Sequence, residues 1–295
     1  MTKVAAVGRL YVVATPIGNL GDFSARAQET LRACQWIAAE DTRHTGVLLK
    51  HFNIQTPQLS LHDHNEAARS IEIIARLQKG DSVALVSDAG TPAISDPGFD
   101  LVRAAAAQGI EVVAIPGPCA AIAALSIGGL PTDRFCFEGF LPARRSARRK
   151  RLEALLHEAR TLVFYEAPHR VHDTLDDCAT VFGANRGATV VREITKVHET
   201  VYRGSLGEHV VRAASDPDFS RGEIVLLIAG SPQAEEAGEP GADGFGGALD
   251  RVLKILLAEL PLKQAAHLAA QLAQVRDNEA YRRALELKPE SASHS

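Results

Sequence analysis

The chain has 295 residues, and its 46% hydrophobic and 23% charged residues argue against general disorder and against a fibrous repeat. This length exceeds the usual single-domain size of ~100–200 residues and predicts two domains. Because 32 Lys and Arg face 36 Asp and Glu, the net charge of -4 excludes a generally basic nucleic-acid coat, and any nucleic-acid contact must be local.

The cysteines and the apolar segments favour a cytoplasmic protein without a membrane partner. The four cysteines contain no CxxC pair, so neither a zinc cluster nor a disulfide framework is indicated. The N-terminal apolar stretch is interrupted by Arg9, which is wrong for a signal peptide. Residues 112–132 carry no charge, but prolines and glycines at both ends predict a buried strand, turn and helix rather than a membrane span.

In the first half of the chain, short β-branched runs alternate with helical patterns. Residues 10–14, 83–86 and 111–115 read as strands, each followed by a Gly/Pro-rich loop and a helix. Ser24 predicts the start of a helix over 25–34, and Asp96-Pro97 resembles a capped helix start. This alternation predicts a mainly parallel sheet.

The same alternation restarts later in the chain. Strands are predicted at 161–165, 188–193 and 223–228, with a helix at 171–182. The fold class is therefore α/β, with two α/β domains of mainly parallel or mixed sheets plus a small C-terminal helical segment. We place the parts at 1–140, 141–230, a flexible linker at 231–247, two or three helices within 248–288, and a disordered tail at 289–295.

Ligands of open α/β sheets bind at the carboxyl ends of the strands, so the loops there are the first places to search. The loop 14–22 resembles a dinucleotide fingerprint whose leading glycine is replaced by Pro16, with Glu40 and Asp41 about 20 residues on, where a ribose-binding acid would lie. An NAD-dependent oxidoreductase stays open on this pattern, although a tight strand-to-helix turn is favoured.

Two later loops have unusual compositions. Residues 87–98 hold two glycines, two prolines, two aspartates and three hydroxyl groups, which favours a binding loop. Residues 115–121 lead into a helix whose first amide groups would point into the same crevice. Within that loop, a small buried filler is favoured over a nucleophile for Cys119.

Two polar clusters admit two interpretations each. Residues 40–45 combine acids, Arg43 and His44, and could cap a helix or hold a polyanion and move a proton. His62 and His64 favour local hydrogen bonding, and we assign no metal.

The run 144–151 carries six cations, which form either a solvated helix face or a phosphate-binding patch.

A series of motifs in one order carries a resemblance to a known family. The motifs lie at 11–22, 39–43, 61–66, 86–92, 115–118, 164–170, 192–196 and 260–266. Together they resemble the tetrapyrrole-methylase-like, S-adenosylmethionine-dependent methyltransferases, and within them the branch that methylates the ribose 2′-hydroxyl of a cytidine in 16S ribosomal RNA. Gly90-Thr91-Pro92 stands where tetrapyrrole methylases commonly have Gly-Asp-Pro, which shifts the balance from tetrapyrrole to RNA.

The resemblance implies a homodimer that takes S-adenosylmethionine as methyl donor and 16S ribosomal RNA in the small subunit as partner. It implies that the donor contacts Gly90, Thr91, Ile94, Cys119, Ala120, Tyr165 and Ile224. To these contacts we add Pro16 and Gly18 of the first loop. We hypothesise that Asp41 and Arg43 are catalytic, and that RNA phosphates bind Arg144, Arg145, Arg148 and Arg149.

Three alternatives differ in what they leave unexplained. A methyltransferase acting on a tetrapyrrole small molecule would have a site roofed by apolar residues and no use for the basic run. A non-enzymatic RNA-binding module would leave the loop 87–98 unexplained, and an oxidoreductase lacks the first glycine of its fingerprint.

Overall fold

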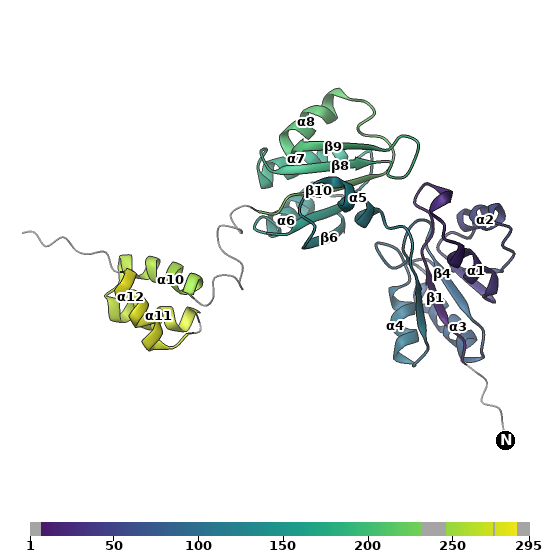
Figure 1. Cartoon of the computed structure of the whole chain (residues 1–295), viewed down its shortest axis with the longest axis horizontal. Coiled ribbons are helices and arrows are strands. Elements are labelled where there is room, and N and C mark those ends of the chain that lie inside the picture. Colours follow the sequence, from purple (N-terminus) through teal and green to yellow (C-terminus); the bar gives the residue numbers. More distant parts are fainter. Residues whose placement is uncertain (1–6, 232–245, 274, 288–295) are drawn as a thin grey trace, which may run out of the picture. The chain divides into compact units, whose positions relative to one another are not determined.

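The computed structural model describes residues 7–231, 246–273 and 275–287. Contacts divide the chain into one unit of residues 1–156 and 160–229 and a second of residues 157–159 and 230–295. The first unit contains two sheets, which we call the first lobe (β1 to β5) and the second lobe (β6 to β10) (Figure 1).

The first lobe is built on a five-stranded parallel sheet in the order β3-β2-β4-β1-β5. Because β1 lies between β4 and β5, the order differs from the dinucleotide-binding order 3-2-1-4-5. The strands are β1 Leu10–Val13, β2 Trp36–Ala39, β3 Gln58–Ser60, β4 Val83–Val86 and β5 Val112–Ile115.

Helices cover both faces of this sheet. On one face Leu31 and Leu49 pack in a cluster with strand residues, and on the other face Ile73 and Leu101 do so. Ser24 accepts a hydrogen bond from the backbone N–H of Ala27 and starts the first helix as predicted. The helices are η1 Leu20–Asp22, α1 Ala25–Ala33, α2 Thr42–His51, α3 Glu66–Gln78 and α4 Phe99–Ala107.

The second lobe has a mixed five-stranded sheet in the order β6-β7-β10-β8-β9. Only β6 and β7 of this sheet are parallel, and the other pairs are antiparallel. The strands are β6 Phe135–Phe140, β7 Thr161–Glu166, β8 Gly187–Arg192, β9 Thr200–Ser205 and β10 Ile224–Ile228. The placement of residues 135–140 in the first domain is corrected here, because β6 hydrogen-bonds to β7.

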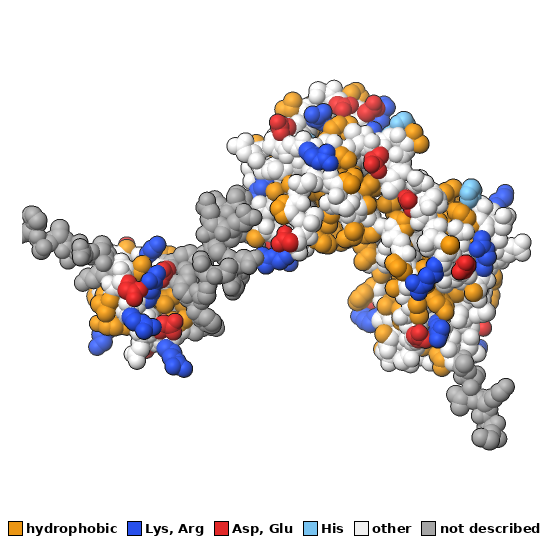
Figure 2. Space-filling model, viewed as in Figure 1, with side chains coloured by type: hydrophobic (Ala, Val, Ile, Leu, Met, Phe, Trp, Pro, Cys, Tyr) orange, Lys and Arg blue, Asp and Glu red, His pale blue; other side chains and the backbone are white. Residues whose placement is uncertain are grey.

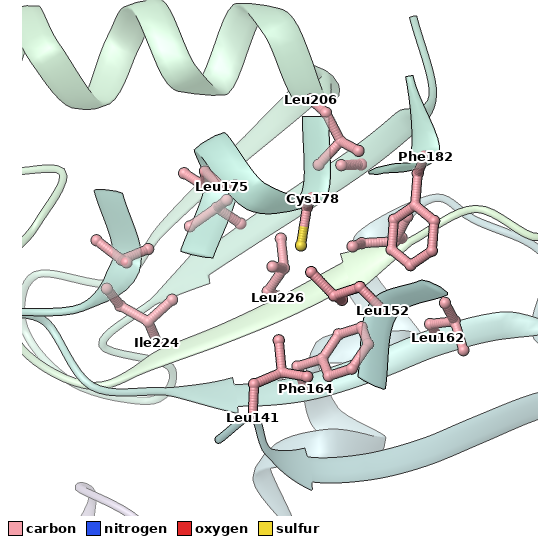
Figure 3. Packing of buried hydrophobic residues seen from close by; sticks show 14 of the residues in the cluster. Leu141, Leu152, Leu162, Phe164, Leu175, Cys178, Phe182, Leu206, Ile224 and Leu226 are labelled. Atoms are coloured by element: carbon pink, nitrogen blue, oxygen red, sulfur yellow. The ribbon is translucent and has the colours of Figure 1, made fainter. Parts of the chain in front are cut away.

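Three helices cover one face of this second sheet. They are α6 Arg145–Ala154, α7 Val171–Phe182 and α8 Leu206–Ser215, and Figure 3 shows Leu152 and Cys178 from the helices against Phe164 and Leu226 from the strands. The opposite face packs against α5 Ala120–Gly128, which follows the last strand of the first lobe. The uncharged segment 112–132 is thus a strand, a turn and a helix, as predicted.

The second unit has a hydrophobic core of its own. Leu249 and Leu253 pack with Ala266, Ala269 and Ala280. The helices are α10 Gly246–Glu259, α11 Leu262–Ala273 and α12 Asp277–Leu287. Most of the predicted linker, and the whole predicted tail, lie outside the described residues. Within the described ranges, no helix combines the length and apolar character that crossing a bilayer requires.

Candidate active site

A cavity of about 400 Å³ is lined by loops of both lobes. Its volume falls within the ~300–1,000 Å³ of small-molecule sites. Seven of the nine predicted donor contacts line it, namely Gly90, Thr91, Ile94, Cys119, Ala120, Tyr165 and Ile224. Four further lining residues, Asp88, Ala89, Ser95 and Asp96, belong to the loop 87–98 that the sequence indicates as a binding loop. The remaining lining residues were not among the predicted contacts: Ile17, Glu40, Phe140, Glu166, Ala167, Pro168, Ile194, Glu223 and Val225.

The loop after β4 approaches the cavity with its backbone. Gly90 exchanges two backbone hydrogen bonds with Thr15, at 2.9 and 3.1 Å, which tie this loop to the loop after β1. At Gly90 φ is +84°, and an added Cβ would lie 3.3 Å from Ile17 Cγ2. Further along the loop, Ala93 and Ser95 also have positive φ, at 67° and 64°. Such backbone strain concentrates at binding sites, where surrounding contacts hold it.

Five carboxyl-bearing residues of the described chain line the cavity, and three of them, Glu40, Asp88 and Asp96, come from the first lobe. Glu40 follows β2, Asp88 follows β4, and Asp96 lies further along the same loop. The backbone N–H of Asp88 donates to Glu40 Oε2 at 3.4 Å. Burial raises the pKa of Asp96 to about 6, and the charges of Asp88 and Asp63 add to the rise against a hydrogen bond from Ser87. Burial also raises the pKa of Glu40, with the charge of Asp96 as the next cause.

Asp96 does not cap a helix, although Asp96-Pro97 resembles a capped start. The residue preceding α4 is Gly98, whose φ is 124°, and the carboxylate of Glu66 accepts hydrogen bonds from the N–H groups of Gly98 and Asp100. A side chain from another helix therefore satisfies the start of α4, which leaves Asp96 free to line the cavity.

The opposite wall is mainly apolar and aromatic. The backbone N–H of Ala121, in the first turn of α5, donates to Tyr165 Oη at 3.2 Å. Phe137 and Phe140 pack edge-on against the Tyr165 ring, with centroids 5.0 and 5.7 Å away. The hydrogen bond and the ring contacts hold the aromatic side chain of β7 in one orientation at the cavity.

The loop after β8 closes the same side. Glu193 and Thr195 have positive φ, at 52° and 66°, on either side of the cavity-lining Ile194. Lys196 forms ion pairs with Glu193 and Glu223 at 2.9 and 3.2 Å, and its aliphatic chain lies over Gly18.

Pro16 and Gly18, the other two predicted donor contacts, do not line this cavity. They line a second cavity of about 320 Å³ between the loop after β1 and α2. Asp88 lines both cavities, and the second one also has Leu20, His44, Thr45, Val47, Leu48, His51 and Ser87. The degenerate fingerprint therefore lies in a strand-to-helix connection whose Pro16 and Gly18 line the cavity beside α2.

The predicted catalytic pair, Asp41 and Arg43, lies at the start of α2 and outside both cavities. Asp41 precedes α2 as its N-cap and accepts hydrogen bonds from the Arg43 backbone N–H, Nε and Nη2 at 2.8, 3.1 and 2.7 Å. These bonds hold the pKa of Asp41 well below its usual range. The side chain of Arg43 is 90% exposed, and neither residue lines either cavity. A carboxylate so stabilised in its charged form is a poor acceptor of a proton.

The basic run folds partly into the second lobe, which corrects the assignment of Arg148 to RNA. Its side chain is 3% exposed and pairs with the fully buried Asp177 at 2.8 Å, because positions 148 and 152 share the buried face of α6. Arg145 bridges Asp176 and Asp177 at 2.9 Å, and Arg149 lies 3.9 Å from Asp177. Arg144 and Lys150 stay exposed. On the face drawn in Figure 2, Lys and Arg are interspersed with Asp and Glu.

The cavity is lined by both apolar side chains and carboxyl groups, so its lining suits a ligand that is partly apolar and positively charged. The family model for tetrapyrrole (corrin/porphyrin) methylases matches residues 9–210, and the chain belongs to that family. S-adenosylmethionine is its methyl donor.

Relatives and a second family model narrow the class. The chain is 53% identical over 288 residues to the Pseudomonas aeruginosa protein named ribosomal RNA small subunit methyltransferase I, covering 97% of this chain and 100% of that protein. The protein of the same name from Escherichia coli O157:H7 is 50% identical, with 95% of each chain covered. The model described as the RsmI C-terminal HTH domain matches residues 243–288.

Solved structures with the same fold are more distant. Uroporphyrin-III-C-methyltransferase from Thermus thermophilus has a TM-score of 0.53 at 20% identity, covering 78% of this chain and 97% of that one. Diphthine synthase has a TM-score of 0.57 at 15% identity, covering 75% and 90%. At such identities only the fold is shared, so the tetrapyrrole alternative has no support beyond distant fold similarity.

Proposed function

We propose that this protein transfers a methyl group from S-adenosylmethionine to small-subunit ribosomal RNA, at the ribose 2′-hydroxyl of a cytidine. The observation that carries the proposal is the nearly full-length similarity to proteins named ribosomal RNA small subunit methyltransferase I, at 53% identity over 97% of this chain. The 2′-hydroxyl and the cytidine are the finer part of the proposal and derive from the motif resemblance. Such a substrate would place the enzyme in the cytoplasm with the ribosome.

The donor would be held in the cavity of about 400 Å³ between the lobes, which we call the donor cavity. Its adenine suits the apolar wall of Tyr165, Ile194 and Ile224, and its positive charge suits the carboxylates of Glu40 and Asp96. Backbone groups around Gly90 permit close approach because no side chain intervenes. When bound, S-adenosylmethionine supplies the methyl group on its sulfonium. The protein's own contribution is to position the donor and to exclude water from around it.

Deprotonation of the acceptor hydroxyl needs a group near both substrates. Methyl transfer is an in-line displacement, so holding the attacking oxygen close to the methyl carbon supplies much of the rate. Asp88 lines both cavities, and its Oδ1 accepts the backbone N–H of Asp41 at 3.1 Å, which fixes its orientation. We therefore move the acid-base role from Asp41 to Asp88, and Asp41 becomes a positioning residue.

The RNA contacts outside the cavities are proposed at exposed cations. Arg144 and Lys150 are exposed on α6, and Arg43 is exposed at the start of α2. Each can pair with a phosphate without leaving a buried carboxylate unpaired. We also propose that the enzyme acts as a homodimer, on the family resemblance.

The experiment that tests the proposed function is methyl transfer in vitro. Small ribosomal subunits from cells lacking this protein are incubated with the purified enzyme and with donor tritiated in its methyl group, and the RNA is digested to nucleosides. We expect label in 2′-O-methylcytidine. Label in a base, in another nucleoside or in no RNA product contradicts the proposal.

A further inference from the structure

The second cavity is lined by the loop after β1, by α2 and by the start of the loop after β4. It lies between η1 and α2, has a volume of about 320 Å³, and meets the donor cavity at Asp88. Two of its lining residues, Leu20 and Val47, are large apolar side chains that are 44% and 72% exposed. Exposed apolar groups beside a hollow are a common feature of binding sites.

A polar atom inside this cavity lacks a partner. Thr45 is 2% exposed, and its Oγ1 has no hydrogen-bond partner within the described part of the chain. A buried hydroxyl without a partner is rare in folded proteins, because its desolvation is uncompensated. Since Thr45 lines the cavity, a bound ligand with a polar edge would satisfy this hydroxyl.

The chemistry of the cavity suits a nucleoside better than a second copy of the donor. The donor cavity is lined by Glu40 and Asp96, among other acids. In the second cavity Asp88, which both cavities share, is the one acidic residue among the described residues of the lining. In their place the second cavity has apolar side chains for a base face, a hydroxyl, and the imidazoles of His44 and His51. RNA-modifying enzymes bind such splayed nucleotides by stacking and by hydrogen bonds to the base edge.

We propose that the second cavity binds the acceptor nucleoside, extruded from the RNA, with its base between Leu20 and Val47 and a polar edge on Thr45 Oγ1. The shared Asp88 then faces the ribose on one side and the donor on the other. The inference rests on the proposed function, since it presupposes an RNA acceptor. It assigns acceptor recognition to η1 and α2 of the first lobe.

The test is steady-state kinetics on small subunits lacking the modification, with donor affinity measured separately by calorimetry. Val47→Glu places a charge at the entrance of the cavity, and Val211→Glu makes the same change on α8, where the side chain is 69% exposed. We expect Val47→Glu to raise the KM for subunits at least ~10-fold, through loss of about 1.4 kcal/mol of binding. Its donor Kd and the kinetics of Val211→Glu should match the wild type.

Thr45→Val preserves shape and removes the hydroxyl, so it tests the same site if the charged variant misfolds. We expect a higher KM or lower kcat for subunits with an unchanged donor Kd. Wild-type kinetics in both cavity variants would overturn the assignment while leaving the proposed function intact. Absence of methylation by the wild-type enzyme would overturn the proposed function, and the nucleoside assignment with it.

Discussion

The loops at the edge of the first sheet and helix α6 are both rich in charge, but the fold uses their charges in opposite ways. Around the donor cavity Glu40, Asp88 and Asp96 face a hollow, and burial raises the pKa of two of them. On α6, Arg148 faces the buried Asp177 and is neutralised within the protein. Charges held without an internal counterion are available to a ligand, whereas charges already paired mainly maintain the fold.

The comparison is tested most strongly at Asp88. Asp88→Asn should lower turnover on small subunits by ~100 to 10,000-fold, the usual cost of losing a positioned acid-base group. Asp41→Asn is the matched control, because asparagine also caps helices and α2 should persist. The measurement is single-turnover transfer of tritiated methyl at saturating donor. A wild-type rate for Asp88→Asn would contradict the assignment, and a large loss in a folded Asp41→Asn beside it would return the catalytic role to Asp41.

The charges of α6 that are paired within the protein are tested at Arg148. Arg148→Ala should lower the free energy of unfolding by about 3–5 kcal/mol, because the fully buried Asp177 loses a main partner. Arg144→Ala, at the exposed residue that immediately precedes this helix and makes no side-chain capping bond, should change the free energy of unfolding by less than ~0.5 kcal/mol. Urea denaturation followed by circular dichroism measures both. Equal stabilities of the two variants would show that the buried pair does not anchor α6.

The role of the donor cavity in the comparison is tested at Gly90. Gly90→Val should weaken donor binding at least ~10-fold, or about 1.4 kcal/mol, since the side chain enters the space between the loop and Ile17. Gly109→Val carries similar backbone strain, at a φ of +69° with nothing within 4 Å of the added Cβ. Calorimetric titration with S-adenosylmethionine separates the two. Unchanged donor affinity in a folded Gly90→Val variant would place the donor elsewhere.

The raised pKa of Asp96, about 6, predicts a pH dependence of donor affinity. As the pH rises from 5 to 7, Asp96 ionises and attracts the positive donor, so the donor Kd should fall several-fold. The free energy of unfolding should change in the opposite direction. Because the pKa of Asp96 is higher in the folded than in the unfolded chain, its contribution to stability falls as the pH rises from about 4 to 6. Asp96→Asn should flatten both profiles, and a Kd that is flat in the wild type contradicts the prediction.

The smallest expected effect concerns the exposed cations of α6. Replacing Arg144 and Lys150 by Ala should make the plot of log affinity for RNA against log salt shallower by ~0.7 to 0.9 per lost phosphate contact. Filter binding to small-subunit RNA at several salt concentrations gives the slope. If the slope is unchanged, phosphates are held elsewhere, and Lys263 and Arg282 of the second unit become the next candidates.

Much of the fold was predictable because its signals are local. The helix at 171–182 and the strand at 83–86 were predicted with their observed bounds, since hydrophobic periodicity and β-branched runs mark them. The edge strand β9 was missed because its side chains are half-buried or exposed and it lacks a continuous apolar run. The three-residue strand β3 was missed for a similar reason.

The site was predictable only where backbone requirements show in the sequence. Gly90 and the small residues around it indicated a binding loop, and the motif resemblance added Tyr165 and Ile224 from the second lobe. Asp96 was misread because an acid before proline is typical of a helix start, while Glu66 from another helix supplies the cap. The burial of Arg148 likewise depends on Asp177, a partner on another helix that local pattern cannot identify.

The central claim is that the donor cavity serves methylation of small-subunit ribosomal RNA. Its most direct test is mass mapping of ribose methylation in 16S ribosomal RNA from cells that lack this protein, complemented with wild-type, Gly109→Val or Gly90→Val protein. We predict that one 2′-O-methylcytidine is absent without the protein, returns with the wild type and with Gly109→Val, and stays absent with Gly90→Val. An unchanged methylation map in cells lacking the protein would contradict the account.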